Sequence, residues 1–177
     1  MRKIVLGIGL VGLFFACGDQ VVQRPVVYQN DDFMKRSQER GKLLLAEENE
    51  WFEQYREKSA LTFTQTSMGF WISNSAIVSE NMAKQGDFIS YDYQVKNLDN
   101  SLIYSYQEIG PQKAVLGKID LPRGLHAALQ LISANDSATI LLPSFLAYGG
   151  FGDQKKIDAD TPIIIEIKAV SYTHLTL

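Results

Sequence analysis

Alternating apolar side chains in the second half of the chain constrain its fold more than any other feature. Between Ile89 and Val95, every second residue is apolar or aromatic and the residues between them are polar. The same period of two recurs in segments 138–142 and 163–169. This period is typical of strands with one face buried and the other in solvent. The sequence therefore predicts an antiparallel sheet that is covered on one face.

One short helix is predicted to cover that sheet. Segment 120–124, Asp-Leu-Pro-Arg-Gly, is a helix-start signal because proline is favoured in the first turn. Apolar residues then follow at helical spacing, namely Leu125, Ala128, Leu129 and Ile132. We expect this helix to lie across one curved sheet.

Turn residues and two further apolar segments complete the predicted domain. Segment 97–101 is rich in turn formers and precedes Leu102–Tyr104, which predicts a hairpin. Segments 61–64 and 69–72 are short strand candidates. The sequence therefore predicts an α+β domain over residues 61–169.

Residues 30–58 have a different, helical character. Asn30 and the two aspartates after it are favoured at helix starts, and apolar residues recur in a heavily charged stretch that ends at Lys58. This pattern favours one or two amphipathic helices, with Gly41 as the expected interruption. Their apolar stripe is expected to pack on the following domain or on a second copy of the chain, so a homodimer through residues 30–58 is one expectation.

The first residues predict a bacterial lipoprotein signal. A basic start precedes the apolar run Ile4–Ala16, which is shorter than the roughly 20 residues of a membrane-spanning helix. Segment 13–18, Leu-Phe-Phe-Ala-Cys-Gly, resembles a lipobox. We therefore predict a signal peptide over residues 1–16, and a lipidated Cys17 and tether over residues 17–29. In the other interpretation, Cys17 is an ordinary buried thiol near a secretory cleavage site.

The predicted lipid anchor implies a location and a membrane partner. Acyl chains on Cys17 would tether the domain to a membrane without crossing it. No acidic run follows Cys17 that would indicate export to the cell surface. We therefore expect a protein of the bacterial envelope, an outer-membrane lipoprotein that faces the periplasm.

Composition excludes several other functions. The single Cys rules out an internal disulfide and a two-Cys metal site or redox pair. Without Arg2 and Lys3 the remaining chain is mildly acidic, which argues against nucleic acid as a partner. Segment 149–152 lacks the strand and helix context of a dinucleotide-binding loop. We predict no cofactor and no metal.

The last residues, 170–177, depart from the strand pattern. They resemble translated sequencing-adapter DNA, and we therefore set them apart as a suspected artefactual tail. A genuine frayed terminus is the alternative.

Three motifs resemble those of the FKBP-type peptidyl-prolyl cis-trans isomerases. They are Leu121–Leu129, Leu141–Gly149 and Thr161–Ile167, and the similarity spans about residues 85 to 169. A proline followed after three residues by Ala-Tyr-Gly, as in segment 143–149, is the most specific part. With the lipobox and the charged spacer, the whole chain resembles gliding-motility-associated FKBP-like lipoproteins of Bacteroidetes-type bacteria.

The resemblance implies a fold, an activity and a site. It implies an FKBP-like twisted antiparallel sheet wrapped around one short helix, and isomerisation of X-Pro bonds in proline-containing polypeptide clients. Catalytic roles are implied for Tyr148 and Tyr93, and substrate-binding roles for Tyr104, Leu121, Leu125 and Ile165. The expected cellular role is folding or assembly of envelope proteins.

Three departures from the family pattern support an alternative. Ser105 stands where active members have Asp, Leu125 stands where Trp is common, and Pro122 lacks a backbone N–H that usually binds the peptide. These residues favour a non-catalytic FKBP-like chaperone or docking module of a gliding or secretion machine. A third reading is a structural subunit that uses the amphipathic helices alone.

The lipobox generates the first testable prediction. Replacing Cys17 by Ser removes the acceptor for the acyl chains, so the variant should appear in the soluble fraction of cells while the unmutated protein remains with membranes. Fractionation followed by immunodetection measures this difference. Continued membrane association of the Cys17→Ser variant would show that another feature holds the protein there.

Overall fold

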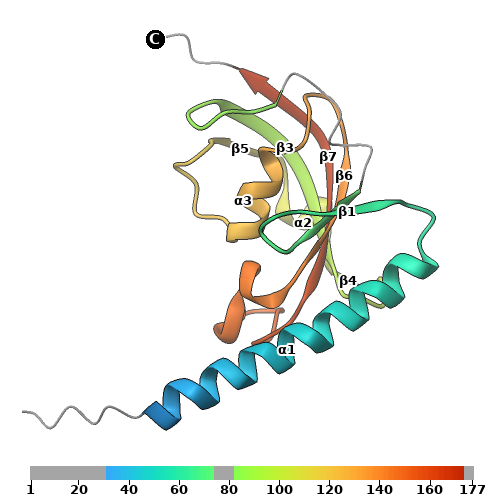
Figure 1. The fold of residues 1–177 in the computed structure, drawn as a ribbon. Coiled ribbons are helices and arrows are strands. Elements are labelled where there is room, and N and C mark those ends of the chain that lie inside the picture. The colour runs from blue at the N-terminus through green and yellow to red at the C-terminus, as the bar shows by residue number, and fades with distance from the viewer. Residues whose placement is uncertain (1–30, 74–81, 174–177) are drawn as a thin grey trace, which may run out of the picture. The chain divides into compact units, whose positions relative to one another are not determined.

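The computed structural model describes residues 31–73 and 82–173 (Figure 1). The predicted signal peptide, Cys17 and the tether lie outside the described residues. The chain divides into two compact units, Met1–Lys35 and Arg36–Leu177. Of the first unit only the beginning of a helix is described, and the packing below concerns the second.

The described residues form one antiparallel sheet and a few helices. The strands follow the order β1-β2-β6-β7-β3-β4, and β5 also pairs with β3. Their bounds are β1 Phe63–Gln65, β2 Trp71–Ser73, β3 Phe88–Lys96, β4 Leu102–Tyr104, β5 Gln112–Val115, β6 Ala138–Leu142 and β7 Ile163–Thr173. The helices are α1 Asp31–Lys58, α2 Tyr106–Ile109, α3 Arg123–Leu129 and the 3₁₀ turns η2 Ser144–Leu146 and η3 Gly149–Phe151.

The sheet curls around α3, as predicted (Figure 1). On β3 the side chains of Ile89, Tyr91 and Val95 are buried, and they pack in one core with Leu125 and Leu129 of α3. The predicted α+β class and the short helix against a curved antiparallel sheet are therefore confirmed. The turn at 97–101 is also present, where Asn97 N donates to Ser101 O at 2.9 Å.

The centre of the sheet is buried on both faces. Leu141 and Ile164 point away from the main core and form a second cluster with Phe52 of α1 and Phe63 of β1. Their neighbours along β6 and β7 belong to the main core. This double burial accounts for the consecutive isoleucines of segment 163–165, which one buried face alone would not require.

Helix α1 is continuous, so the predicted interruption at Gly41 is wrong. Glycine costs a helix about 1 kcal/mol relative to alanine, which a long helix packed along one side tolerates. The expectation that the spacer packs on the following domain is confirmed by Phe52. The homodimer through residues 30–58 stays a prediction. No described helix is both long enough and apolar enough to cross a membrane.

The expectation that the strand pattern breaks after residue 169 is wrong. β7 continues to Thr173, and Tyr172 pairs with Ile89 across the sheet. The register shifts between Ser90 and Asp92, and this irregularity interrupts the alternation that marks a regular strand. The Tyr172 hydroxyl donates to the Leu129 carbonyl oxygen at 3.2 Å. The suspected artefactual origin of residues 170–177 is a separate prediction and stays one.

Two glycines give a matched test of this packing. A Cβ at Gly124 would lie 1.8 Å from Leu142 Cδ2 and 3.1 Å from Leu146 Cβ, whereas a Cβ at Gly41 would meet nothing within 4 Å. Gly124→Ala should therefore lower the free energy of unfolding by about 1–2 kcal/mol through overpacking. Gly41→Ala should raise it by roughly 0.5–1 kcal/mol. Chemical denaturation measures both, and equal effects would contradict the described contacts.

Candidate functional site

The segment between β6 and β7 carries Tyr148. Pro143 begins it in an extended conformation, and its carbonyl oxygen accepts from Leu146 N at 3.0 Å and from Ala147 N at 3.1 Å. Leu146 is buried in the main core. Tyr148 follows as the residue before η3 and is half-buried. The chain therefore holds the aromatic ring at the edge of the core.

The structure brings the six predicted site residues to one core. Leu125 and Ile165 are fully buried in it. The other four are partly buried and pack against it, namely Tyr93, Tyr104, Leu121 and Tyr148. Of the six, these four side chains are therefore the ones that a peptide could contact directly. The role of each residue toward a substrate stays a prediction.

The tyrosines of this cluster lie in a partly desolvated environment. Desolvation raises the pKa of Tyr148 to about 12, with smaller contributions from Tyr93, Asp153 and Tyr104. Desolvation also raises the pKa of Tyr93, whose ring stacks on Tyr91 with 5.8 Å between centroids. These hydroxyls are thus protonated at neutral pH. Within the described residues nothing accepts a hydrogen bond from the Tyr148 hydroxyl, which is therefore available as a donor.

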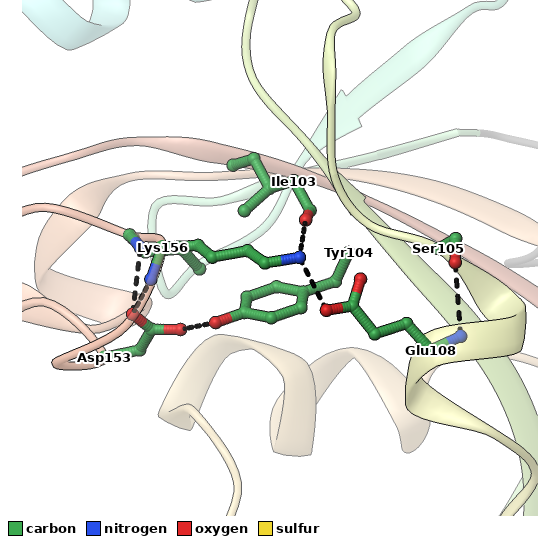
Figure 2. A network of polar contacts seen from close by, with 7 residues as sticks. Ile103, Tyr104, Ser105, Glu108, Asp153 and Lys156 are labelled. Atoms are coloured by element: carbon green, nitrogen blue, oxygen red, sulfur yellow. Dashed lines mark hydrogen bonds and ion pairs between the residues drawn. The ribbon is translucent and has the colours of Figure 1, made fainter.

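A polar network holds Tyr104 in place (Figure 2). The Tyr104 hydroxyl donates to Asp153 Oδ2, and the Lys156 ammonium lies 4.8 Å from the centroid of the Tyr104 ring. Lys156 Nζ also donates to Ile103 O at 3.2 Å and to Glu108 Oε1 at 2.5 Å. Tyr104, for which a substrate-binding role is predicted, is therefore tied to the loop that follows Tyr148.

Asp153 is the centre of this loop. Its Oδ1 accepts from three backbone amides, those of Lys155 at 2.9 Å, Lys156 at 2.9 Å and Ile157 at 2.8 Å. Desolvation acts to raise the pKa of Asp153, but the hydrogen bonds from Tyr104 and these amides outweigh it and lower the pKa to about 2. The preceding Gly152 has φ +63°, and a Cβ there would lie 2.1 Å from Ile157 O. Only glycine fits at position 152, because any other side chain would collide with the backbone of Ile157.

Sequence reasoning missed Asp153, Lys156 and Glu108. Each is a charged residue in a surface segment that shows no regular alternation of apolar and polar residues. Their partner Tyr104 lies 49 residues before Asp153 in the sequence. The available signal was local: a glycine followed by Asp in segment 152–153 is typical of a turn closed by a carboxylate.

Two of the residues that depart from the family pattern, Ser105 and Pro122, have structural roles. The Ser105 hydroxyl accepts from Glu108 N at 3.2 Å and so caps α2. Pro122 precedes α3, and its carbonyl oxygen accepts from His126 N at 3.0 Å. Ser105 is therefore engaged in starting a helix, and Pro122 contributes no N–H to the site.

A separate groove of about 830 Å³ lies between α1 and the turn after β3. Trp51, Tyr55, Leu98 and Pro162 are among its lining residues. None of the six predicted site residues lines it. This groove is thus distinct from the part of the core surface where Tyr93, Tyr104 and Tyr148 lie.

Comparison with known sequences identifies one family. Residues 79–170 match the family model of the FKBP-type peptidyl-prolyl cis-trans isomerase. The chain is 31% identical over 90 residues to the peptidyl-prolyl cis-trans isomerase FKBP10 of Bos taurus, and 25% identical over 88 residues to FKBP9 of Homo sapiens. These matches cover 50% and 49% of this chain but only 15% of each relative.

Comparison with solved structures identifies the same fold. FkpA from Escherichia coli superposes with a TM-score of 0.61 at 17% identity, over 82% of this chain and 70% of that one. A peptidyl-prolyl cis-trans isomerase from Pseudomonas syringae pv. tomato superposes with a TM-score of 0.59 at 19% identity, over 75% and 96%. At these identities the likeness concerns the fold alone.

The Asp153 contacts predict a pH-dependent contribution to stability. Because the pKa of Asp153 is lowered to about 2 from 3.8, its contribution is present above pH 3.8 and is lost as pH falls toward 2. The unfolding free energy of the unmutated protein should exceed that of Asp153→Asn near pH 5, and the gap should close near pH 2. Tyr104→Phe removes one of the hydrogen bonds that lower the pKa of Asp153. The stabilisation by Asp153 should therefore be lost over a narrower range of pH in this variant. Denaturation at a series of pH values measures this, and a gap constant from pH 5 to pH 2 would contradict it.

Proposed function

The chain belongs to the FKBP-type peptidyl-prolyl cis-trans isomerase family, and from this membership we propose that it catalyses the isomerisation of X-Pro bonds. The observation that supports the proposal most is that Tyr93, Tyr104, Leu121 and Tyr148 are all partly buried and pack against one core, and we call these four residues the tyrosine cluster. The chain spans only a small part of the curated relatives it matches, so the activity is proposed for this domain by itself.

The chemistry requires an environment rather than a reactive group. Rotation about an amide bond has a barrier of about 18–20 kcal/mol because resonance keeps it planar, and no covalent step is needed to cross it. An apolar surface removes water from the prolyl amide and disfavours its polar planar form relative to the twisted transition state. Tyr93, Leu121 and Tyr148 would supply this surface. Leu125 and Ile165 would support it from beneath.

Tyr148 has a further role in this proposal. Its hydroxyl is protonated at neutral pH, since desolvation raises the pKa to about 12. It can therefore donate to a carbonyl oxygen of the bound peptide. Pro122 removes another donor that members of the family usually offer, so the hydroxyl of Tyr148 carries more of the polar recognition. We expect a slower enzyme for the same reason.

We propose a cellular setting from the N-terminal sequence. Lipidation of Cys17 would anchor the protein to the outer membrane, with the domain in the periplasm. Its clients would be proline-containing segments of envelope proteins, including those of a gliding or secretion machine. The resemblance of the lipobox and spacer to gliding-motility lipoproteins supports this setting.

A second candidate keeps the fold without catalysis. In this alternative the domain is a chaperone or docking module that binds unfolded or partner chains at the tyrosine cluster. Two observations favour it: the Ser105 hydroxyl is engaged by Glu108 N, and Pro122 has no N–H.

The test is acceleration of a proline-limited refolding reaction by the full chain in detergent solution. The unmutated protein should accelerate it, and Tyr148→Phe should reduce the effect about tenfold, because one hydrogen bond is worth roughly 1–1.5 kcal/mol. Tyr55→Phe is the matched control, since Tyr55 is also half-buried but its hydroxyl lies 3.4 Å from Asn100 Oδ1.

The outcomes separate the two candidates. No acceleration by the unmutated protein would remove the isomerase. Binding of an unfolded chain without acceleration would favour the chaperone. Equal loss in Tyr148→Phe and Tyr55→Phe would remove the proposed donor role of Tyr148.

A further inference from the structure

The segment that carries Tyr148 begins with a backbone amide that the segment cannot satisfy. Ser144 is the first residue of η2, and Pro143 before it makes no side-chain cap. Amides in the first turn of a helix have no partner within that helix. Ser144 is only 2% exposed, so bulk water does not reach it readily. An acceptor from elsewhere in the fold is needed.

Glu48 of α1 is that acceptor. Its Oε2 accepts from Ser144 N at 3.1 Å, although 96 residues separate the two in sequence. Glu48 is 1% exposed, and its Oε1 has no hydrogen-bond partner within the described residues. Desolvation raises the pKa of Glu48, and the bonds with Ser144 oppose this shift.

The buried carboxylate is a poor choice for packing alone. Burying a charged or polar group without full hydrogen bonding costs stability, and an apolar side chain at this position would avoid that cost. Helix α1 already has Phe52 to pack on the sheet. Glu48 is therefore better explained by what it does to Ser144 than by what it adds to the packing of α1.

A second contact ties the far end of the segment to α1. The Arg40 guanidinium donates to the Asp160 carboxylate. Asp160 N in turn donates to Gly149 O at 2.9 Å, next to Tyr148. Arg40 is largely exposed, and exposed ion pairs contribute little. The buried contact of Glu48 is the stronger of the two.

The path from Ser144 to Tyr148 is short and packed. Ala147 N donates to Ser144 O at 3.0 Å. Leu146, between these two residues, is buried against the start of α3, where a Cβ added at Gly124 would lie 3.1 Å from Leu146 Cβ. A shift at Ser144 would therefore move Ala147 and the tyrosine that follows it.

We propose that Glu48 is a positioning residue for Tyr148. Helix α1, the predicted helical spacer, would then contribute to the activity of the isomerase domain. This inference rests on the proposed function. The spacer sets the orientation of the Tyr148 hydroxyl through the amide of Ser144, and it does so without touching the substrate.

Three variants of the full chain in detergent solution test this. Glu48→Leu fills nearly the same space without an acceptor, and Glu48→Gln keeps an acceptor oxygen. Glu47→Leu is the matched control, since Glu47 is the exposed neighbour on the same helix. Hydrogen exchange is measured at the amides of residues 144–151. Isomerisation of a short X-Pro peptide is measured by NMR over a range of peptide concentrations.

Glu48→Leu should speed amide exchange in residues 144–151 about tenfold, the loss expected for one hydrogen bond. It should lower kcat about tenfold and change KM less than twofold, because Tyr148 is misplaced while the apolar surface remains. Glu48→Gln should restore both quantities, and Glu47→Leu should change neither. If Glu48→Leu fails to fold, Ser144→Pro removes the donor instead and should have the same effects.

Unchanged exchange and kcat in Glu48→Leu would overturn the proposal, and so would equal losses in Glu48→Leu and Glu48→Gln. An unmutated protein without isomerase activity would overturn the proposed function. The exchange data would then still decide whether Glu48 orders the segment.

Discussion

The direct pairing of Leu142 with Ile163 fixes the two ends of the segment that carries Tyr148. These residues end β6 and begin β7, the two strands that are buried on both faces, so the segment between them starts and finishes at fixed points. Within that frame the chain can only fold back over the edge of the core, and Tyr148 lies there. The same pairing places Leu141 and Ile164 on the opposite face, where α1 packs. The spacer and the tyrosine cluster are thus on two sides of one pair of strands.

Polar contacts hold the predicted site residues and the segment that carries Tyr148. The Tyr104 ring is tied through its hydroxyl to Asp153, and Asp153 closes its own loop through three backbone amides. The start of the preceding segment is tied through Ser144 to Glu48. Such bonds add little to net stability individually, but they are directional and so define one geometry. If the domain is an isomerase, its apolar surface must favour a twisted amide over a planar one, and a single fixed geometry would serve this better than extra buried area.

The sequence was sufficient to predict the helix and the strands whose apolar residues lie on one buried face. The alternation from Ile89 to Val95 predicted β3, and the helical spacing after Leu125 predicted α3. The prediction at Gly41 was wrong because a single glycine is a weak signal in a long packed helix. Short elements without a period, α2 and β5, were not predicted at all. The contacts of Glu48 with Ser144 and of Asp153 with Tyr104 were beyond sequence reasoning, since each joins distant segments at residues whose charge alone suggests a solvated surface.

The isomerase and the chaperone readings use one surface and differ in a single physical respect. A docking module needs only to bind the peptide, whereas an enzyme must bind the twisted amide more tightly than the planar one. Apolar contacts from Leu121 and Tyr93 would serve both, because they would bind the peptide and would also remove water from the prolyl amide. A hydrogen bond from a fixed hydroxyl is sensitive to it, because the direction of the acceptor changes as the amide rotates. In the proposed isomerase, which has no N–H at Pro122, catalysis would depend on the orientation of Tyr148. That orientation would be set from outside the cluster, by the segment that begins at Ser144.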